Sequence, residues 1–88
     1  MYKIIGAITL KTRKQDYGEK NIVGKNIETL RKSKNIQQNE FIAQLQSMGL
    51  DIDPSSYSKL EGQVRGASDI EIYHIAKALD VTVDSLFS

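Results

Sequence analysis

IDPSSYSKLE, residues 52–61, predicts a short helix whose beginning is marked by two consecutive residues. Asp53 can accept hydrogen bonds from the first free backbone N–H groups of a helix. Pro54 suits the first turn because the N–H that it lacks would be unpaired there. At about 100° per residue, Ser56, Tyr57 and Leu60 share one side of this helix. The opposite side carries Pro54, Ser55, Ser58, Lys59 and Gly62. We therefore expect one packed face and one free face.

The free face of this helix carries small hydroxyl groups and one ammonium group, without a carboxylate. Such groups can approach the base edges and the phosphates of DNA closely. The solvated face of an ordinary amphipathic helix has a similar composition. Both interpretations are therefore open from this stretch alone.

Length and composition indicate one small domain. The chain has 88 residues, 40% of them hydrophobic, and no cysteine, so an apolar core must supply its stability without disulfides. No apolar run approaches the roughly 18 to 20 residues of a membrane span. The apolar residues of MYKIIGAITLKTRK precede its basic residues, which is the reverse of a secretory signal. We expect a soluble, cytoplasmic protein that does not contact a membrane.

Charge is distributed unevenly along the chain. Residues 1–36 hold nine basic and three acidic residues, a charge of +6, and the net charge of +1 leaves −5 for the remainder. Lys59 and Arg65 are two of only three basic residues in that acidic remainder. This asymmetry suggests one side that faces nucleic acid, although a solvated mixed surface can show the same pattern.

Apolar spacing predicts five helices between residues 23 and 87, and hence an all-α fold. The first is expected over residues 23–34 and the second from about Gln38 to Gly49. Asn35 and Gly49 can take the left-handed backbone that ends a helix. The helix that starts at Pro54 is the third.

The last two helices follow from separate signals. Ser68 and Glu71 form a capping box, the clearest helix start in the chain, ahead of apolar residues at core spacing. Thr82 is expected to cap a fifth, short helical turn that buries Leu86 and Phe87.

The first 22 residues differ in character from the rest. YKIIGAITL, residues 2–10, is rich in β-branched residues and predicts a strand or a flexible arm. A lone strand cannot satisfy its backbone groups, so a second subunit is its simplest partner. We expect residues 1–22 to form an extended or partly disordered arm, and residues 23–88 to form the domain. Three sources of dimer contacts are open: this arm, the last helix with Leu86 and Phe87, or both.

Three stretches in order carry a resemblance to a known family: LRKSKNIQQNEFIAQL, IDPSSYSKLEGQ and IAKALDVTVDSLF. Together they resemble the phage-repressor type of helix-turn-helix domain, also called the XRE or lambda-repressor-like family. The resemblance covers residues 24–87 and implies a compact five-helix DNA-binding domain. It implies that the second and third helices form the DNA-binding unit, with the third helix in the major groove.

The resemblance also implies roles for individual residues. Ser55, Ser56 and Lys59 fall on or beside base-reading positions, with Pro54 on a further one and Ser58 adjacent. Gln38 occupies a position that commonly contacts the phosphate backbone. Arg31 and Glu61 correspond to a structural ion pair. The expected DNA-binding set is Gln38, Asn39, Pro54, Ser55, Ser56, Ser58, Lys59, Gln63 and Arg65, the last two for backbone contacts.

The chain departs from the family pattern in three places. Ile42 stands where relatives usually carry alanine, which implies wider packing of the second helix against the third. QSMGLD, residues 46–51, lengthens the turn between these helices by about five residues, as in a subgroup of the family. Pro54 can offer a base only apolar contact.

An enzyme is the first alternative class. His74 is the only histidine and is distant in sequence from the serines, so no nucleophile, base and orienting group can be assembled. The carboxylates of Asp51, Asp53 and Asp69 lack calcium-loop spacing, and no glycine-rich phosphate loop is present. We expect no catalytic residues, metal, cofactor or small-molecule substrate.

The function expected from these observations is sequence-specific DNA binding. The protein is expected to act as a transcriptional regulator, a repressor that binds a near-palindromic operator in double-stranded DNA as a homodimer. The alternative is a protein-binding module, such as an antitoxin or an accessory subunit, that uses the same fold.

Overall fold

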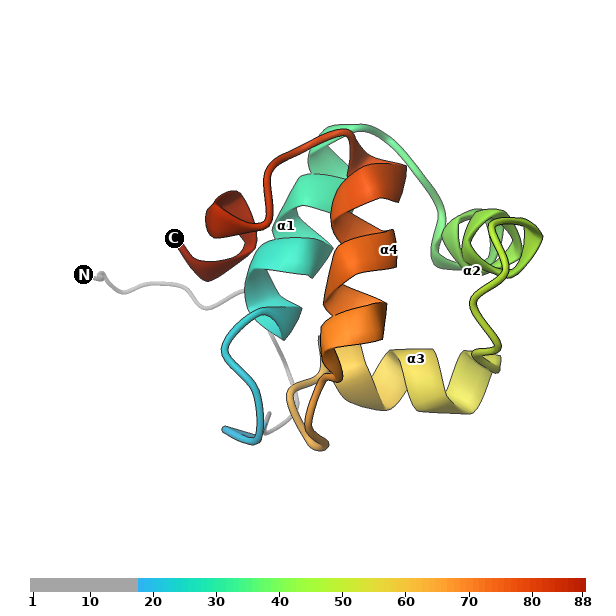
Figure 1. The fold of residues 1–88 in the computed structure, drawn as a ribbon. Coiled ribbons are helices and arrows are strands. Elements are labelled where there is room, and N and C mark those ends of the chain that lie inside the picture. The colour runs from blue at the N-terminus through green and yellow to red at the C-terminus, as the bar shows by residue number, and fades with distance from the viewer. Residues whose placement is uncertain (1–17) are drawn as a thin grey trace.

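A computed structural model describes residues 18–88, in which the chain forms four α-helices and one short 3-10 helix (Figure 1). The elements are α1 (Gly24–Ser33), α2 (Gln38–Ser47), α3 (Pro54–Glu61), α4 (Asp69–Leu79) and η1 (Asp84–Phe87). Within this part of the chain there is no strand, and the all-α class is confirmed. The segment Tyr2–Leu10, expected as a strand or an arm, lies outside the described residues.

The prediction of a fifth α-helix was wrong. Residues 84–87 form a 3-10 helix because its backbone bonds close over three residues: Ser85 N–H donates to the carbonyl of Thr82, and Leu86 N–H to that of Val83. The Thr82 hydroxyl oxygen also accepts from Ser85 N–H. Leu86 is buried as expected, but Phe87 is 46% exposed, which corrects its assignment to the core.

The helix starts follow the local signals in the sequence. Asp53 Oδ1 accepts a hydrogen bond from Ser56 N–H at 2.7 Å, so α3 begins at Pro54. Ser68 and Glu71 form the expected reciprocal box, with Ser68 N–H donating to Glu71 Oε1 at 2.9 Å. These short-range bonds set where α3 and α4 start.

The helix ends are marked by left-handed backbone. Asn35, Gly49 and Asp80 have φ values of 61°, 99° and 58°, after α1, α2 and α4 respectively. The first two were expected from the sequence, and Asp80 plays the same part for α4.

The helices enclose one hydrophobic core. In Figure 1, α1 and α4 lie side by side, α3 lies near the ends where they begin and contacts α1, and α2 is seen nearly along its axis. The Phe41 and Tyr57 rings meet edge to face at a centroid distance of 5.8 Å and join α2 to α3. Both rings are fully buried, so their contact fixes the position of α3 on the body. The largest fully buried side chains are Tyr57, Phe41, Ile27, Leu45, Leu60, Ile75, Leu79, Leu86 and Val23.

The connection between α2 and α3, residues 48–53, is held on the core. Leu50 and Ile52 are buried, and Gln46 Nε2 donates to the carbonyl of Ile52 at 2.8 Å. The longer turn expected from QSMGLD is therefore a packed segment that adds apolar surface to the core.

Residues 18–22 are attached to the helical body. Gly18 N–H donates to the carbonyl of Gly62, and Lys20 N–H donates to that of Gln63 at 2.9 Å. The backbone of Gly18 passes so close to Gln63 that a side chain at position 18 would meet its carbonyl oxygen. Residues 18–22, which the expected division assigned to the arm, are thus hydrogen-bonded to the residues that follow α3.

Gly62 does not lie on the free face of the third helix, to which it was assigned from the sequence. It is buried. It follows the last residue of α3 and its carbonyl is covered by the segment that begins at Gly18, so it lies on an internal side of the body.

Candidate nucleic-acid interface

The exposed side of α3 gathers most of the residues expected to read DNA. Pro54, Ser55, Ser58 and Lys59 are exposed, and Ser56 is half-buried. Tyr57 and Leu60 on the opposite side are fully buried. The helix therefore has one anchored face and one open polar face, as its sequence predicts.

Glu61, the last residue of α3, is 4% exposed and lies at the centre of a polar network. It accepts two bonds from Arg31, from Nε at 2.9 Å and from Nη2 at 3.0 Å. The Tyr57 hydroxyl donates to it at 2.6 Å, and Gln38 Nε2 donates to it at 3.1 Å. Arg31 also donates to the carbonyl of Ile36 at 2.7 Å. The ion pair expected from the sequence is present, and it joins α1, α2 and α3.

The pKa shifts of Arg31 and Tyr57 agree with the directions of the hydrogen bonds in this network. The hydrogen bond to Glu61 raises the pKa of Arg31 above its usual range against the effect of burial. Burial raises the pKa of the Tyr57 hydroxyl, and the neighbouring Glu61 carboxylate adds to that effect. Tyr57 therefore remains a neutral donor, and Glu61 is left as the acceptor of every bond that it makes in the network.

Gln38 lies at the first position of α2 and contacts α3 with both ends of its amide. Its Nε2 donates to Glu61, and its Oε1 accepts from the Ser58 hydroxyl at 3.1 Å. Gln38 was expected to contact a phosphate, and it also connects the two helices. The neighbouring Asn39 is exposed, and its Oδ1 accepts from Glu40 N–H at 2.9 Å.

Arg65 connects the loop after α3 to α4. It forms a two-pronged ion pair with Glu71, at 2.8 and 3.0 Å, and donates to the carbonyls of Ser56 and Gly66. These four bonds engage most of the five N–H donors of a guanidinium group. Arg65 is thus a structural residue in addition to its expected role near phosphates.

The pKa of Glu71 is lowered by this arrangement. Burial acts to raise it, but hydrogen bonds from Arg65 and from Ser68 N–H outweigh burial. Glu71 is therefore held in the charged form, where it serves both Arg65 and the first turn of α4.

Gln63 and Asn21 stabilise the end of α3. Gln63 has a φ of 64°, and its Nε2 donates to the carbonyl of Asn21 at 3.2 Å. Asn21 Nδ2 donates to the carbonyls of Leu60 and Arg65, and its Oδ1 accepts from Gly24 N–H at 2.8 Å. Sequence reasoning missed Asn21. No local pattern marked it, because its bonds to Leu60 and Arg65 join positions 39 and 44 residues apart in the chain.

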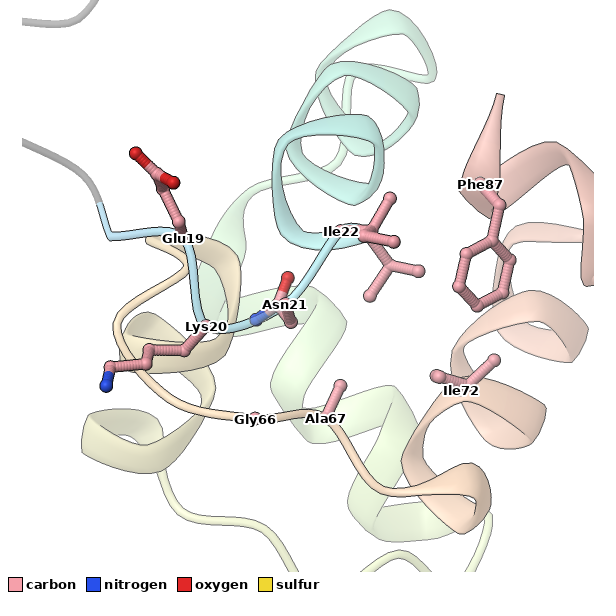
Figure 2. A pocket seen from close by; sticks show the side chains of 9 residues that line it. Glu19, Lys20, Asn21, Ile22, Gly66, Ala67, Ile72 and Phe87 are labelled. Atoms are coloured by element: carbon pink, nitrogen blue, oxygen red, sulfur yellow. The ribbon is translucent and has the colours of Figure 1, made fainter.

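A second candidate region is a surface hollow of about 320 Å³ between residues 19–23, the loop before α4 and η1. Figure 2 shows Ile22, Ile72 and Phe87 on its apolar side, and Glu19 and Lys20 farther away. Ile22 is 66% exposed. The residues that line the hollow are Glu19, Lys20, Asn21, Ile22, Val23, Gly66, Ala67, Ile72 and Phe87.

None of the helices in residues 18–88 combines the length and the apolar character needed to cross a membrane.

Comparisons with protein-family models, with curated proteins and with solved structures found no match to this chain.

Proposed function

We propose that this protein is a sequence-specific DNA-binding regulator that reads the major groove with α3. The observation that carries the proposal is the arrangement of charge on this helix. Its only carboxylate, Glu61, is buried against Arg31, whereas Ser55, Ser58 and Lys59 are exposed. A helix with this distribution can approach a polyanion without a carboxylate of its own on the open face, and the exposed Asp53 directly before it accepts a hydrogen bond from Ser56 N–H.

The way in which α3 is held supports the same proposal. Base readout requires side chains to be placed on a rigid support. Tyr57 and Leu60 anchor α3 in the core, and Glu61 connects it to both α1 and α2. The resemblance of three stretches of the chain to XRE-type helix-turn-helix domains adds to this support, with α2 and α3 as the DNA-binding pair.

The regulator is proposed to act as a repressor that occupies its operator as a symmetric dimer. Two α3 helices in successive major grooves require half-sites about 34 to 36 Å apart, and therefore a near-palindromic operator. Ile22 and Phe87, 66% and 46% exposed at the hollow of Figure 2, offer apolar surface to a second copy. A chain that sediments as a strict monomer at the concentrations of DNA binding would contradict the dimer.

Selection from a random double-stranded DNA library at low salt tests the proposal. The protein should enrich a near-palindromic motif. Ser55→Ala and Lys59→Ala should each relax the preference at one base position, with losses of about 1 to 3 kcal/mol for a direct contact. Ser33→Ala is the matched control, because Ser33 ends α1 and its hydroxyl donates to the carbonyl of Leu30.

The second candidate is a protein-binding module such as an antitoxin or an accessory subunit. It is favoured by the exposed apolar side chains of Ile22, Ile70, Tyr73 and Phe87. Failure of the folded protein to enrich any motif in the selection would overturn DNA binding and favour this candidate.

A further inference from the structure

The hydrogen bonds around Glu61 determine which group donates and which accepts in two further bonds, from Gln38 to Glu61 and from Ser58 to Gln38. Ser58 lies on the exposed face of α3. An ionised carboxylate only accepts hydrogen bonds. Glu61 faces the Arg31 guanidinium on both of its oxygens, so the group of Gln38 that lies 3.1 Å from Glu61 Oε1 must be the NH₂ end of the amide. The carbonyl end of Gln38 then points the other way.

The orientation of Gln38 determines the role of Ser58. Gln38 Oε1 lies 3.1 Å from the Ser58 hydroxyl oxygen and can only accept a hydrogen bond. A serine hydroxyl has a single proton, so its one donated hydrogen bond goes to Gln38 Oε1. Its oxygen keeps lone pairs, and the side chain is exposed on the proposed reading face.

We propose that Ser58 acts as a hydrogen-bond acceptor toward DNA and selects a base that presents an exocyclic amino group in the major groove. These bases are adenine, through N6, and cytosine, through N4. Guanine O6 and N7 and thymine O4 are acceptors, and they would face the Ser58 oxygen without a proton between them. The inference rests on the proposed function, because it names the chemistry that one residue of α3 recognises.

Gln38 has a consequent positioning role. It does not need to touch a base, because it sets the direction of the Ser58 hydroxyl through its bond to Glu61. Replacing Gln38 by an apolar residue of similar length frees the Ser58 proton, so that the hydroxyl can donate as well as accept. The preference for an amino-bearing base should then weaken without loss of the serine itself.

The test is the same library selection, performed on the wild type, Ser58→Ala and Gln38→Met. The wild type should show a position in each half-site that is restricted to adenine or cytosine. Ser58→Ala should lose that restriction while keeping the rest of the motif. Gln38→Met should tolerate guanine or thymine at the same position.

A second measurement does not depend on Gln38→Met being folded. In the selected site, the amino-bearing base at that position is replaced by purine or 2-pyrimidinone, which lack the amino group. Wild-type binding should weaken about threefold to tenfold, the range of one hydrogen bond, and Ser58→Ala should bind both sites equally.

The outcomes separate the inference from the proposed function. An enriched motif whose adenine or cytosine preference survives in Ser58→Ala would overturn the role of Ser58 and leave DNA binding intact. A motif with guanine or thymine at every position that responds to Ser58→Ala would do the same. A folded wild type that enriches no motif would overturn both.

Discussion

Arg31 shows at the scale of one residue how burial determines what a charge does. Its pair with Glu61 is 7% and 5% exposed, whereas the next residue, Lys32, is 64% exposed and pairs with Glu28 at 3.2 Å. Removing one partner of a buried pair leaves an uncompensated charge in the protein interior. The Lys32 ammonium is largely in water, so its removal changes little in the protein interior.

Arg31→Ala is therefore expected to lower the free energy of unfolding by about 3 to 5 kcal/mol, and Glu61→Ala by a similar amount. Lys32→Ala is the matched control and should cost about 0.5 kcal/mol or less. Urea denaturation followed by circular dichroism measures all three. Equal midpoints for Arg31→Ala and Lys32→Ala would mean that the buried pair does not stabilise the fold.

Glu71 gives a prediction about pH. Hydrogen bonds from Arg65 and Ser68 lower its pKa below the ordinary value of 4.5, against the effect of burial. The stabilisation is thus fully present above about pH 4.5 and is lost as pH falls through the lower pKa of the folded state.

The unfolding free energy of the wild type should therefore decrease more steeply than that of Glu71→Gln as pH falls below about 4.5. Arg65→Gln removes the main group that lowers this pKa and should flatten the slope in the same way. Chemical denaturation at a series of pH values measures these slopes. Identical slopes in all three proteins would show that Glu71 does not link stability to pH.

At the scale of elements, the first residue of α1 packs directly against the last turn of α3. A Cβ atom added to Gly24 would meet the carbonyl oxygens of Leu60 and Glu61. Backbone atoms cannot move aside as a flexible side chain can, so α1 and α3 would have to separate.

Gly24→Ala is expected to lower the free energy of unfolding by about 1 to 3 kcal/mol. Gly66→Ala is the control, because a Cβ atom there meets only open space, and it should stay within about 0.5 kcal/mol of the wild type. Thermal denaturation distinguishes the two. A Gly24→Ala protein as stable as Gly66→Ala would place the two helices farther apart than the structure does.

At the scale of the whole molecule, α3 lies at the end of the helical domain where α1 and α4 begin, so the proposed DNA-facing surface is confined to that end (Figure 1). Lys59 is exposed on α3, whereas Lys77 lies on α4 with its ammonium 5.3 Å from the centre of the Tyr73 ring. Two lysines with the same charge thus belong to different surfaces.

In addition to relaxing the preference at one base position, Lys59→Ala removes an ammonium charge that lies near the phosphates in the proposed complex, so on the selected DNA site it is expected to reduce the dependence of the logarithm of affinity on the logarithm of salt concentration by about one. Lys77→Ala should leave this slope unchanged. Fluorescence anisotropy across a salt series measures both slopes. Equal slopes in the two variants would place the DNA on a different surface.

Features set by near neighbours in the chain were predictable. The Asp53 cap, the Ser68–Glu71 box and the left-handed residues Asn35 and Gly49 each depend on groups three or four residues away. The packed and open faces of α3 follow from helical periodicity in the same way. The sequence alone thus determined the four α-helices, the starts of α3 and α4, the ends of α1 and α2, and most of the face of α3 that is open.

Tertiary structure alone decided the contacts between segments that are distant in sequence. The bonds of Asn21 to Leu60, of Arg65 to Ser56 and of Gln38 to Ser58 join positions that no periodicity relates. The Leu86 and Phe87 side chains have equal apolar character, yet one is buried and the other exposed. Their exposures differ because η1 packs against α1, so Leu86 is covered and Phe87 is not, and this contact forms only in the folded protein.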